Sequence, residues 1–249
     1  MDKKQKLGSE TAKQGFQNEK DIISKFNNWK IDSNAKTWLR IMGYKLTKIE
    51  YVEAIVLSGY KTDVQVQVTI KLKKAIDIEN LQVKLVSNLK GFNQIDKRWV
   101  DKYVEMWSIP ENITVLLKQY TGEISPIIEN PKDERRTFVN EFSNKNQDIL
   151  VNWIKNHKTL IVNDIIKGRG KFSAEWMLVA QKIAEDAKWV LKPINIVVNH
   201  FGNGEVRITK QGNIKIGNIT MQRKGGDKGR KTAQMLQFKI NPAELFEKN

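Results

Sequence analysis

The chain has 249 residues, with 43 lysines and arginines against 28 aspartates and glutamates, and a net charge of +15. Such an excess of positive charge is self-repelling in a compact protein and is typical of chains that bind a polyanion. DNA or RNA is the first candidate partner, and an acidic membrane is the second. Cysteine is absent and the two histidines, His157 and His200, are far apart, which excludes disulfides and thiolate sites and argues against histidine metal clusters and catalytic triads. Any metal would therefore be hard and oxygen-liganded, like Mg²⁺.

The N-terminal segment combines a polar start with a helical pattern. Residues 1–14 are polar and predict a loose stretch, lacking the apolar core of a signal peptide. From Phe16 to Trp29 apolar residues recur at helical spacing, which predicts an amphipathic helix. Glu19 falls on its apolar face, where an unpaired carboxylate is unfavourable. Two interpretations stay open for Glu19, a structural salt bridge and a ligand of a metal or water.

Two alternating runs predict strands whose polar faces could meet. Asp63 opens the first run, residues 63–70, and a charged connection over residues 71–80 leads to the second, residues 81–86. In the second run Gln82 and Lys84 share one face, roughly 6–7 Å apart. If the runs pair, Asp63 and Gln82 could offer oxygen ligands to a divalent metal and Lys84 could hold an attacking water, as phosphodiester hydrolysis requires. The alternative is a strand with a solvated polar face.

The remaining elements mix helices and strands, and no repeat or linker divides the chain. We expect a helix through Tyr103 and Trp107 and further helices at 111–121, 133–142, 147–156 and 193–200. Strands are expected at 174–180, 206–208, 214–216, 219–221 and 235–240, and either type at 159–166. This order predicts an α/β (mixed α+β) fold with a central mixed β-sheet flanked by helices, in one domain spanning residues 1–249. No apolar run approaches the ~20 residues of a membrane span.

Three polar segments are candidates for contact with nucleic acid. Five of the ten residues at 222–231 are basic and three are glycine, which allows close approach to phosphates and arginine contacts with guanine. Gln237 and Lys239 share a strand face and either read base edges or face water. Phe92, beside Gly91 in a polar loop, either wedges into a base step or plugs the core.

Several blocks along the chain are similar to the HinP-type restriction endonucleases, which read GCGC. The blocks with the same residues and nearly the same spacing are 8–22, 56–61, 82–88, 91–97, 168–170, 222–227 and 235–240. The resemblance implies a restriction-endonuclease-like PD-(D/E)xK fold with a Mg²⁺-dependent site. It gives Asp63, Gln82 and Lys84 the catalytic positions. Because Gln82 replaces the usual acid, Glu19 becomes the further metal ligand beside Asp63 and Gln82.

The same resemblance assigns DNA contacts and a function. It implies a catalytic core at about residues 15–110, C-terminal DNA-reading strands at about 205–240, and contacts by Asn88, Phe92, Gln94, Lys97, Arg223, Lys224, Asp227, Arg230, Gln234, Gln237 and Lys239. Gln234 stands where this family suggests asparagine, so the target is not fixed at every base. We expect a type II restriction endonuclease that hydrolyses double-stranded DNA with Mg²⁺ at a GC-rich palindromic tetranucleotide, GCGC first, leaving 5′-phosphate ends.

Two alternatives keep the basic chain but change its task. One is a structure- or damage-directed PD-(D/E)xK nuclease, and the other is a non-catalytic DNA-binding protein whose Gln82 marks a dead site. The expected partners are double-stranded DNA, a second copy of the chain if it dimerises, and a cognate DNA methyltransferase as a genetic partner rather than a subunit. No membrane contact is expected, and the expected location is the cytoplasm of a bacterial-type cell.

Overall fold

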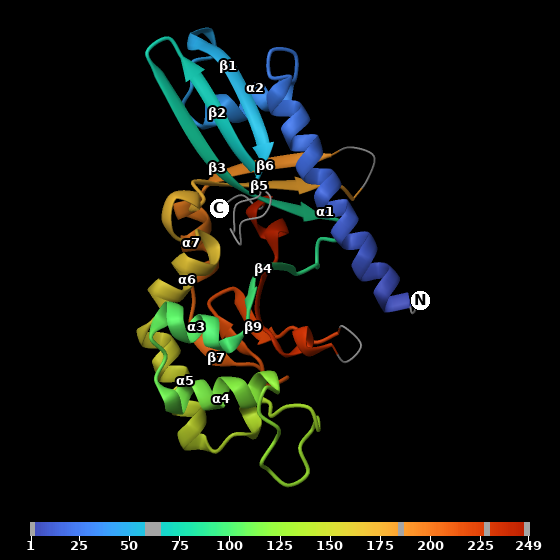
Figure 1. Cartoon of the computed structure of the whole chain (residues 1–249), viewed down its shortest axis with the longest axis vertical. Coiled ribbons are helices and arrows are strands. Elements are labelled where there is room, and N and C mark those ends of the chain that lie inside the picture. Colours follow the sequence, from blue (N-terminus) through green and yellow to red (C-terminus); the bar gives the residue numbers. More distant parts are fainter. Residues whose placement is uncertain (1–2, 58–65, 184–186, 227–229, 247–249) are drawn as a thin grey trace. The chain divides into compact units, whose positions relative to one another are not determined.

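The computed structural model describes residues 3–57, 66–183, 187–226 and 230–246. The chain folds into two compact units (Figure 1). Unit 1 consists of Met1–Asn93, Ile166–Val197 and Asn241–Asn249, and unit 2 consists of Gln94–Ile165 and Val198–Ile240. Each unit is therefore built from stretches that are separated in the sequence.

Unit 1 is organised around a five-stranded mixed sheet. Its strands are β1 (Ile49–Val56), β2 (Val66–Leu72), β3 (Ala75–Val86), β5 (Trp176–Gln181) and β6 (Lys188–Pro193), in the order β1-β2-β3-β5-β6. The β3–β5 pair is parallel and the other pairs are antiparallel. The central strand β3 is thus hydrogen-bonded on one side to the strand before it and on the other to a strand about ninety residues later in the chain.

Two helices pack against this sheet, and α1 crosses it in Figure 1. They are α1 (Lys3–Asn27) and α2 (Ser33–Ile41), whose N-cap Asp32 accepts a hydrogen bond from the N–H of Ala35. Ile22 and Phe26 of α1 are fully buried in a core with the inward residues of the strands, including Leu81 and Val83. A 3₁₀ turn at Pro242–Phe246 contacts β3, β5 and β6. Burial of these apolar side chains is the main force that fixes β3 in place.

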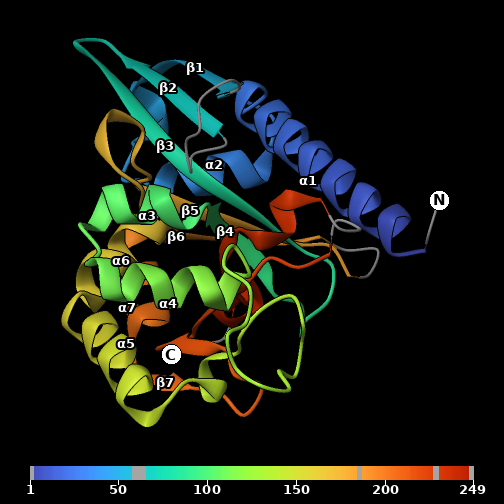
Figure 2. The ribbon, with the colours of Figure 1, turned by 60° about the horizontal axis from the view of Figure 1, so that its bottom comes forward.

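Unit 2 contains a second sheet and helices that pack around it. The sheet order is β4-β10-β9-β8-β7, with strands β4 (Asn93–Arg98), β10 (Leu236–Ile240), β9 (Ile219–Arg223), β8 (Ile214–Ile216) and β7 (Val206–Ile208). The helices are α3 (Val100–Trp107), α4 (Glu111–Thr121), α5 (Asn144–Asn156), α6 (Lys158–Ile166) and α7 (Ile194–Gly202), which begins in unit 1. Figure 2 shows α4 beside α3 and α5. Phe238 of β10 packs edge-on against Tyr103 and Trp107 of α3.

The structure corrects three expectations about local structure. The polar start is helical, since α1 begins at Lys3. The supposed connection over residues 71–80 is mostly strand, because β2 runs to Leu72 and β3 starts at Ala75. Residues 133–142 form a turn and a short 3₁₀ helix at Val139–Glu141 instead of a helix. Charged residues misled the second prediction, since this part of the sheet has an exposed face.

Most of the other elements are where the sequence predicts them, and the fold class is confirmed. The segment left undecided, residues 159–166, is helix α6, and strand β4 was not predicted. The molecule is a mixed α/β protein with a central mixed sheet flanked by helices. Within the described residues, no helix combines the length and apolar character needed to cross a membrane.

Candidate functional site

The alternation predicted around Gln82 is present in β3. Leu81 and Val83 face the core shared with α1, so Gln82 and Lys84 lie together on the other face of the strand. Gln82 is fully buried and Lys84 is 7% exposed. The described part of β2 begins at Val66 directly opposite Leu81, one residue before Gln82. Asp63 lies outside the described residues, so the structure leaves its position beside this pair untested.

Two amides on the same face of β3 have opposite hydrogen-bond status. Asn80 is 6% exposed; its Oδ1 accepts a hydrogen bond from Gln67, and its Nδ2 donates to the carbonyls of Lys171 and Ser173. Gln82 is 0% exposed, and neither its Oε1 nor its Nε2 has a hydrogen-bond partner. A buried polar group left unpaired lowers stability by about 1–3 kcal/mol and calls for an explanation. Gln82 thus has the free donor and acceptor atoms that a ligand would use.

Glu19 of α1 lies close enough to β3 to interact electrostatically with Lys84. Burial raises the pKa of the Glu19 carboxyl, and the positive charge of Lys84 opposes that rise. Both effects follow from placing a carboxylate in a half-buried position near an ammonium. The structure therefore brings Glu19 together with Lys84, one of the two β3 residues.

Asn18, which the sequence analysis did not single out, has the same status as Gln82. It is 1% exposed, and both polar atoms of its side chain lack a hydrogen-bond partner. It lies one residue before Glu19, and four and eight residues before Ile22 and Phe26, on the buried stripe of α1. The signal was available in the sequence, because a polar residue on an apolar stripe is the same argument that drew attention to Glu19.

The loop after β3 carries exposed candidate contacts. Asn88 and Phe92 are exposed, and Oδ1 of Asn88 accepts a hydrogen bond from the N–H of Lys90, which fixes a turn. Gln94 and Lys97 lie on β4, the first exposed and the second half-buried. An aromatic ring left exposed next to a structured turn is consistent with a contact residue.

In unit 2 the pairing of β9 with β10 separates two groups of candidate contacts. Gln237 pairs with Gln222 and is nearly fully buried. Lys239 shares its face of β10 and is half-buried, and burial lowers the pKa of its ammonium group. Arg223 pairs with Leu236, so it lies on the opposite face of the sheet. Arg223 and the Gln237–Lys239 pair are therefore adjacent but lie on opposite faces of the sheet.

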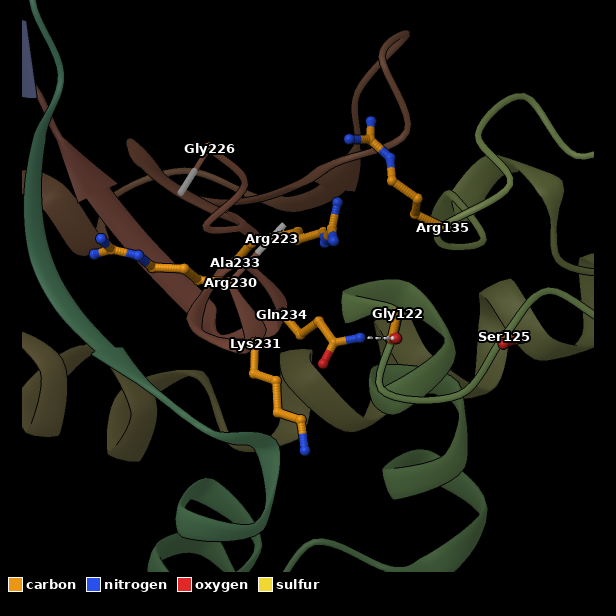
Figure 3. Close-up of a pocket in the computed structure, with 9 residues that line it drawn as sticks. All are labelled: Gly122, Ser125, Arg135, Arg223, Gly226, Arg230, Lys231, Ala233 and Gln234. Atoms are coloured by element: carbon orange, nitrogen blue, oxygen red, sulfur yellow. Dashed lines mark hydrogen bonds between the residues drawn. The ribbon is translucent and has the colours of Figure 1, made fainter. Parts of the chain in front are cut away.

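Four residues of the basic segment, Arg223, Gly226, Arg230 and Lys231, line a pocket of about 290 Å³ (Figure 3). The N–H of Lys224 donates to the carbonyl of Met235, which extends the β9–β10 ladder, while Asp227 lies outside the described residues. Arg230 and Gln234 line the pocket, and Nε2 of Gln234 donates to the carbonyl of Gly122 at 2.6 Å. One donor of Gln234 is thus already used within the protein.

Comparisons with known proteins identify the family. The model of the R.HinP1I restriction endonuclease family matches residues 42–246. The solved structure of restriction endonuclease MspI in complex with its cognate DNA is similar, with a TM-score of 0.65 and 14% identity, over 96% of this chain and 93% of that chain. A search of curated protein sequences found no match. The restriction endonuclease fold is confirmed, and the protein, as a type II restriction endonuclease and DNA hydrolase, belongs to the R.HinP1I restriction endonuclease family.

Proposed function

We propose that this enzyme hydrolyses both strands of a GC-rich palindromic tetranucleotide, with GCGC as the first candidate, and leaves 5′-phosphate and 3′-hydroxyl ends. The observation that carries the proposal is the contrast between Asn80 and Gln82, since one buried amide is fully used and its neighbour on the same face is not. Membership of the R.HinP1I family supports DNA as the substrate. Both units act in this proposal as parts of one endonuclease domain.

The candidate site suits a hard divalent cation such as Mg²⁺. Gln82 offers an unpaired amide oxygen, and Glu19 offers a half-buried carboxylate whose raised pKa a nearby cation would lower. Asp63, outside the described residues, is the third proposed ligand; the described side chains alone assemble no group of three carboxylates or histidines. Bound there, Mg²⁺ would neutralise the negative charge that develops on the scissile phosphate.

Lys84 is the residue we propose to act on the attacking water. It shares the face of Gln82 and interacts with Glu19, so its ammonium group is near both proposed ligands. An ammonium group donates hydrogen bonds and can orient a water for in-line attack while stabilising the hydroxide that forms. Glu19 in turn favours the charged form of Lys84, because a carboxylate nearby stabilises an ammonium.

We further propose that base recognition divides between two sets of residues. Gln237 and Lys239 share one strand face, where an amide and an ammonium can read base edges in a groove. Phe92 and Gln94 follow the catalytic strand, where an exposed ring can enter a base step. The further DNA contacts proposed are Asn88, Lys97, Arg223, Lys224, Asp227, Arg230 and Gln234.

Digestion of plasmid DNA of known sequence, with and without Mg²⁺, tests the function. Discrete, Mg²⁺-dependent fragments with ends mapping to GCGC are expected. A smear or cutting confined to junctions and lesions would point to a structure- or damage-directed nuclease, and no turnover at all would point to a non-catalytic DNA-binding protein. A cognate methyltransferase should protect the same sites, and sedimentation would show whether the active species is a homodimer. The proposed location is the cytoplasm, where the enzyme would encounter its double-stranded DNA substrate.

A further inference from the structure

Two segments of unit 2, separated by nearly ninety residues in the chain, bring three arginines together. Arg135 and Arg136 follow α4 in a segment that the sequence analysis assigned to a helix, and Arg223 ends β9. All three line one cavity with Asp133, Gly225 and Gly226, and Arg135, Arg223 and Gly226 also line the 290 Å³ pocket beside it. We call Arg135, Arg136 and Arg223, with the space they enclose, the arginine pocket.

We propose that the arginine pocket binds a backbone phosphate of duplex DNA, with Arg135 and Arg223 as its ligands and Arg136 as a positioning residue. This inference rests on the proposed function, in which DNA is the substrate. It adds Arg135 and Arg136 to the contacts, and it assigns Arg223 to the backbone instead of to the bases.

Two of these arginines are half-buried without complete hydrogen bonding. The Nε atoms of Arg136 and Arg223 are both inaccessible and have no partner in the structure. Burial lowers the pKa of each guanidinium, and for Arg223 the charges of Arg136 and Arg135 lower it further. Like charges that are partly removed from water raise the free energy of the protein unless a counter-charge joins them. An anion is the ligand that relieves this.

The carboxylate nearby, Asp133, supplies only part of that counter-charge. Oδ1 and Oδ2 of Asp133 accept hydrogen bonds from Nε and Nη2 of Arg135 at 2.7 and 3.0 Å. The Nε atom of Arg136 is 3.8 Å from Asp133, which is beyond hydrogen-bond distance. The hydrogen bonds of the Asp133 side chain thus go to Arg135, and a single carboxylate balances the charges of three guanidinium groups.

Aromatic rings hold Arg136 in place. Its guanidinium carbon lies 3.9 Å from the ring centroid of Phe138 and 5.7 Å from that of Tyr120. The hydroxyl of Tyr120 donates in turn to the carbonyl of Met221 in β9, two residues before Arg223. Cation–π contacts of this kind fix a guanidinium at modest energy. Arg136 therefore connects the loop to the strand that presents Arg223, which is why we assign it a positioning role.

The shape and lining of the pocket favour a phosphate. Figure 3 shows Arg223 and Arg135 extending towards the same space, whereas Arg230 and Lys231 extend away from it. None of the nine residues lining the larger pocket is acidic, whereas Asp133 lines the smaller cavity. Gly225 and Gly226 have φ values of 64° and 66°, and an added Cβ would meet nothing within 4 Å, so the space beside both glycines is open. Guanidinium groups donate two parallel hydrogen bonds to phosphate oxygens.

Equilibrium binding of duplex DNA at several salt concentrations tests this assignment. Mg²⁺ is left out of these measurements so that the DNA is not cleaved. The variants are Arg135→Gln and Arg223→Gln, and the control is Arg207→Gln, which removes the same charge from an exposed position on β7 of the same sheet. The probes are a duplex containing GCGC and one lacking it. Thermal unfolding of each variant verifies that it is folded.

Each pocket variant should weaken binding of both duplexes by a similar factor, roughly three- to tenfold, and reduce the slope of log affinity against log salt by about one. The control should change neither quantity. Weakening confined to the GCGC duplex would overturn the proposal in favour of base reading, and unchanged slopes would overturn it outright. If the wild-type protein did not cleave plasmid DNA at GCGC, the proposed function would be contradicted. The assignment of the arginine pocket to a phosphate would not be affected by that outcome.

Discussion

The two units leave polar groups unpaired in different ways, and the difference indicates what each can bind. Among the described residues, the unpaired buried groups in unit 1 are the neutral amides of Asn18 and Gln82, whereas in unit 2 they are the guanidinium nitrogens of Arg136 and Arg223. An amide oxygen accepts and can ligate a cation, but a guanidinium group only donates. This difference supports our proposal that unit 1 holds the metal and the water and that unit 2 binds the polyanion. Cutting DNA needs both.

The largest expected effect tests the catalytic half of this comparison. Changing Lys84 to alanine removes the group proposed to orient the water, so the single-turnover rate of cleavage should fall by about 10²–10⁴-fold. DNA affinity measured without Mg²⁺ should stay near the wild-type value, because the DNA-binding groups of unit 2 are intact. Lys74→Ala, at an exposed position in the β2–β3 turn, is the matched control. Cleavage at the wild-type rate by the Lys84 variant would exclude the role.

Gln237 tests whether base choice belongs to unit 2. Replacing it by alanine should reduce discrimination between GCGC and singly altered sites by about 1–3 kcal/mol, since a two-point contact with a base edge is lost. Competitive cleavage of the two duplexes measures this directly. The Arg207→Gln variant should discriminate as the wild type does. If the Gln237 variant cut more slowly but with unchanged preference, its side chain would serve the fold rather than the reading of bases.

A matched pair on β3 sharpens the claim that Gln82 is unpaired. Gln82→Leu should raise the free energy of unfolding by about 1–3 kcal/mol while abolishing cleavage, because it removes an unsatisfied buried amide. Asn80→Leu should lower it, because the carbonyls of Lys171 and Ser173 lose their donor. Urea unfolding of both variants measures the two changes in the free energy of unfolding. Equal destabilisation by both would mean that Gln82 is hydrogen-bonded after all.

The smallest expected effect concerns the pH dependence of stability at Glu19. Its pKa is raised in the folded protein, so above the unfolded value of 4.5 the unfolded chain ionises first and folding loses stability as the pH rises. Glu19→Gln should therefore match the wild type below that pH and gain stability relative to it above. Urea unfolding at pH 4 and pH 7 gives the comparison. A variant that instead became less stable at pH 7 would show that the pairing with Lys84 outweighs burial.

Features of the fold and the site that depend on local sequence could be predicted, whereas those that depend on contacts between distant segments could not. Gln82 and Lys84 could be placed on one face because alternation is a local property of a strand. The charged residues of 71–80 hid a strand, since exposed faces of a sheet tolerate lysine and glutamate. That Arg135 and Arg223 share a pocket could not be predicted, because their approach depends on how α4, its following loop and β9 pack. The unpaired state of Gln82 likewise depends on its neighbours in three dimensions.

The parallel pairing of β3 with β5 has a consequence for synthesis of the enzyme. Met177 and Val179, the partners of Gln82 and Lys84, are translated almost a hundred residues after them, and the turn at Pro242–Phe246 that contacts the same strands comes later still. A chain released early from the ribosome would lack the strand that pairs with one side of β3. Nuclease activity should thus arise only near the completion of translation, so that premature fragments are harmless to the DNA of the cell that makes them.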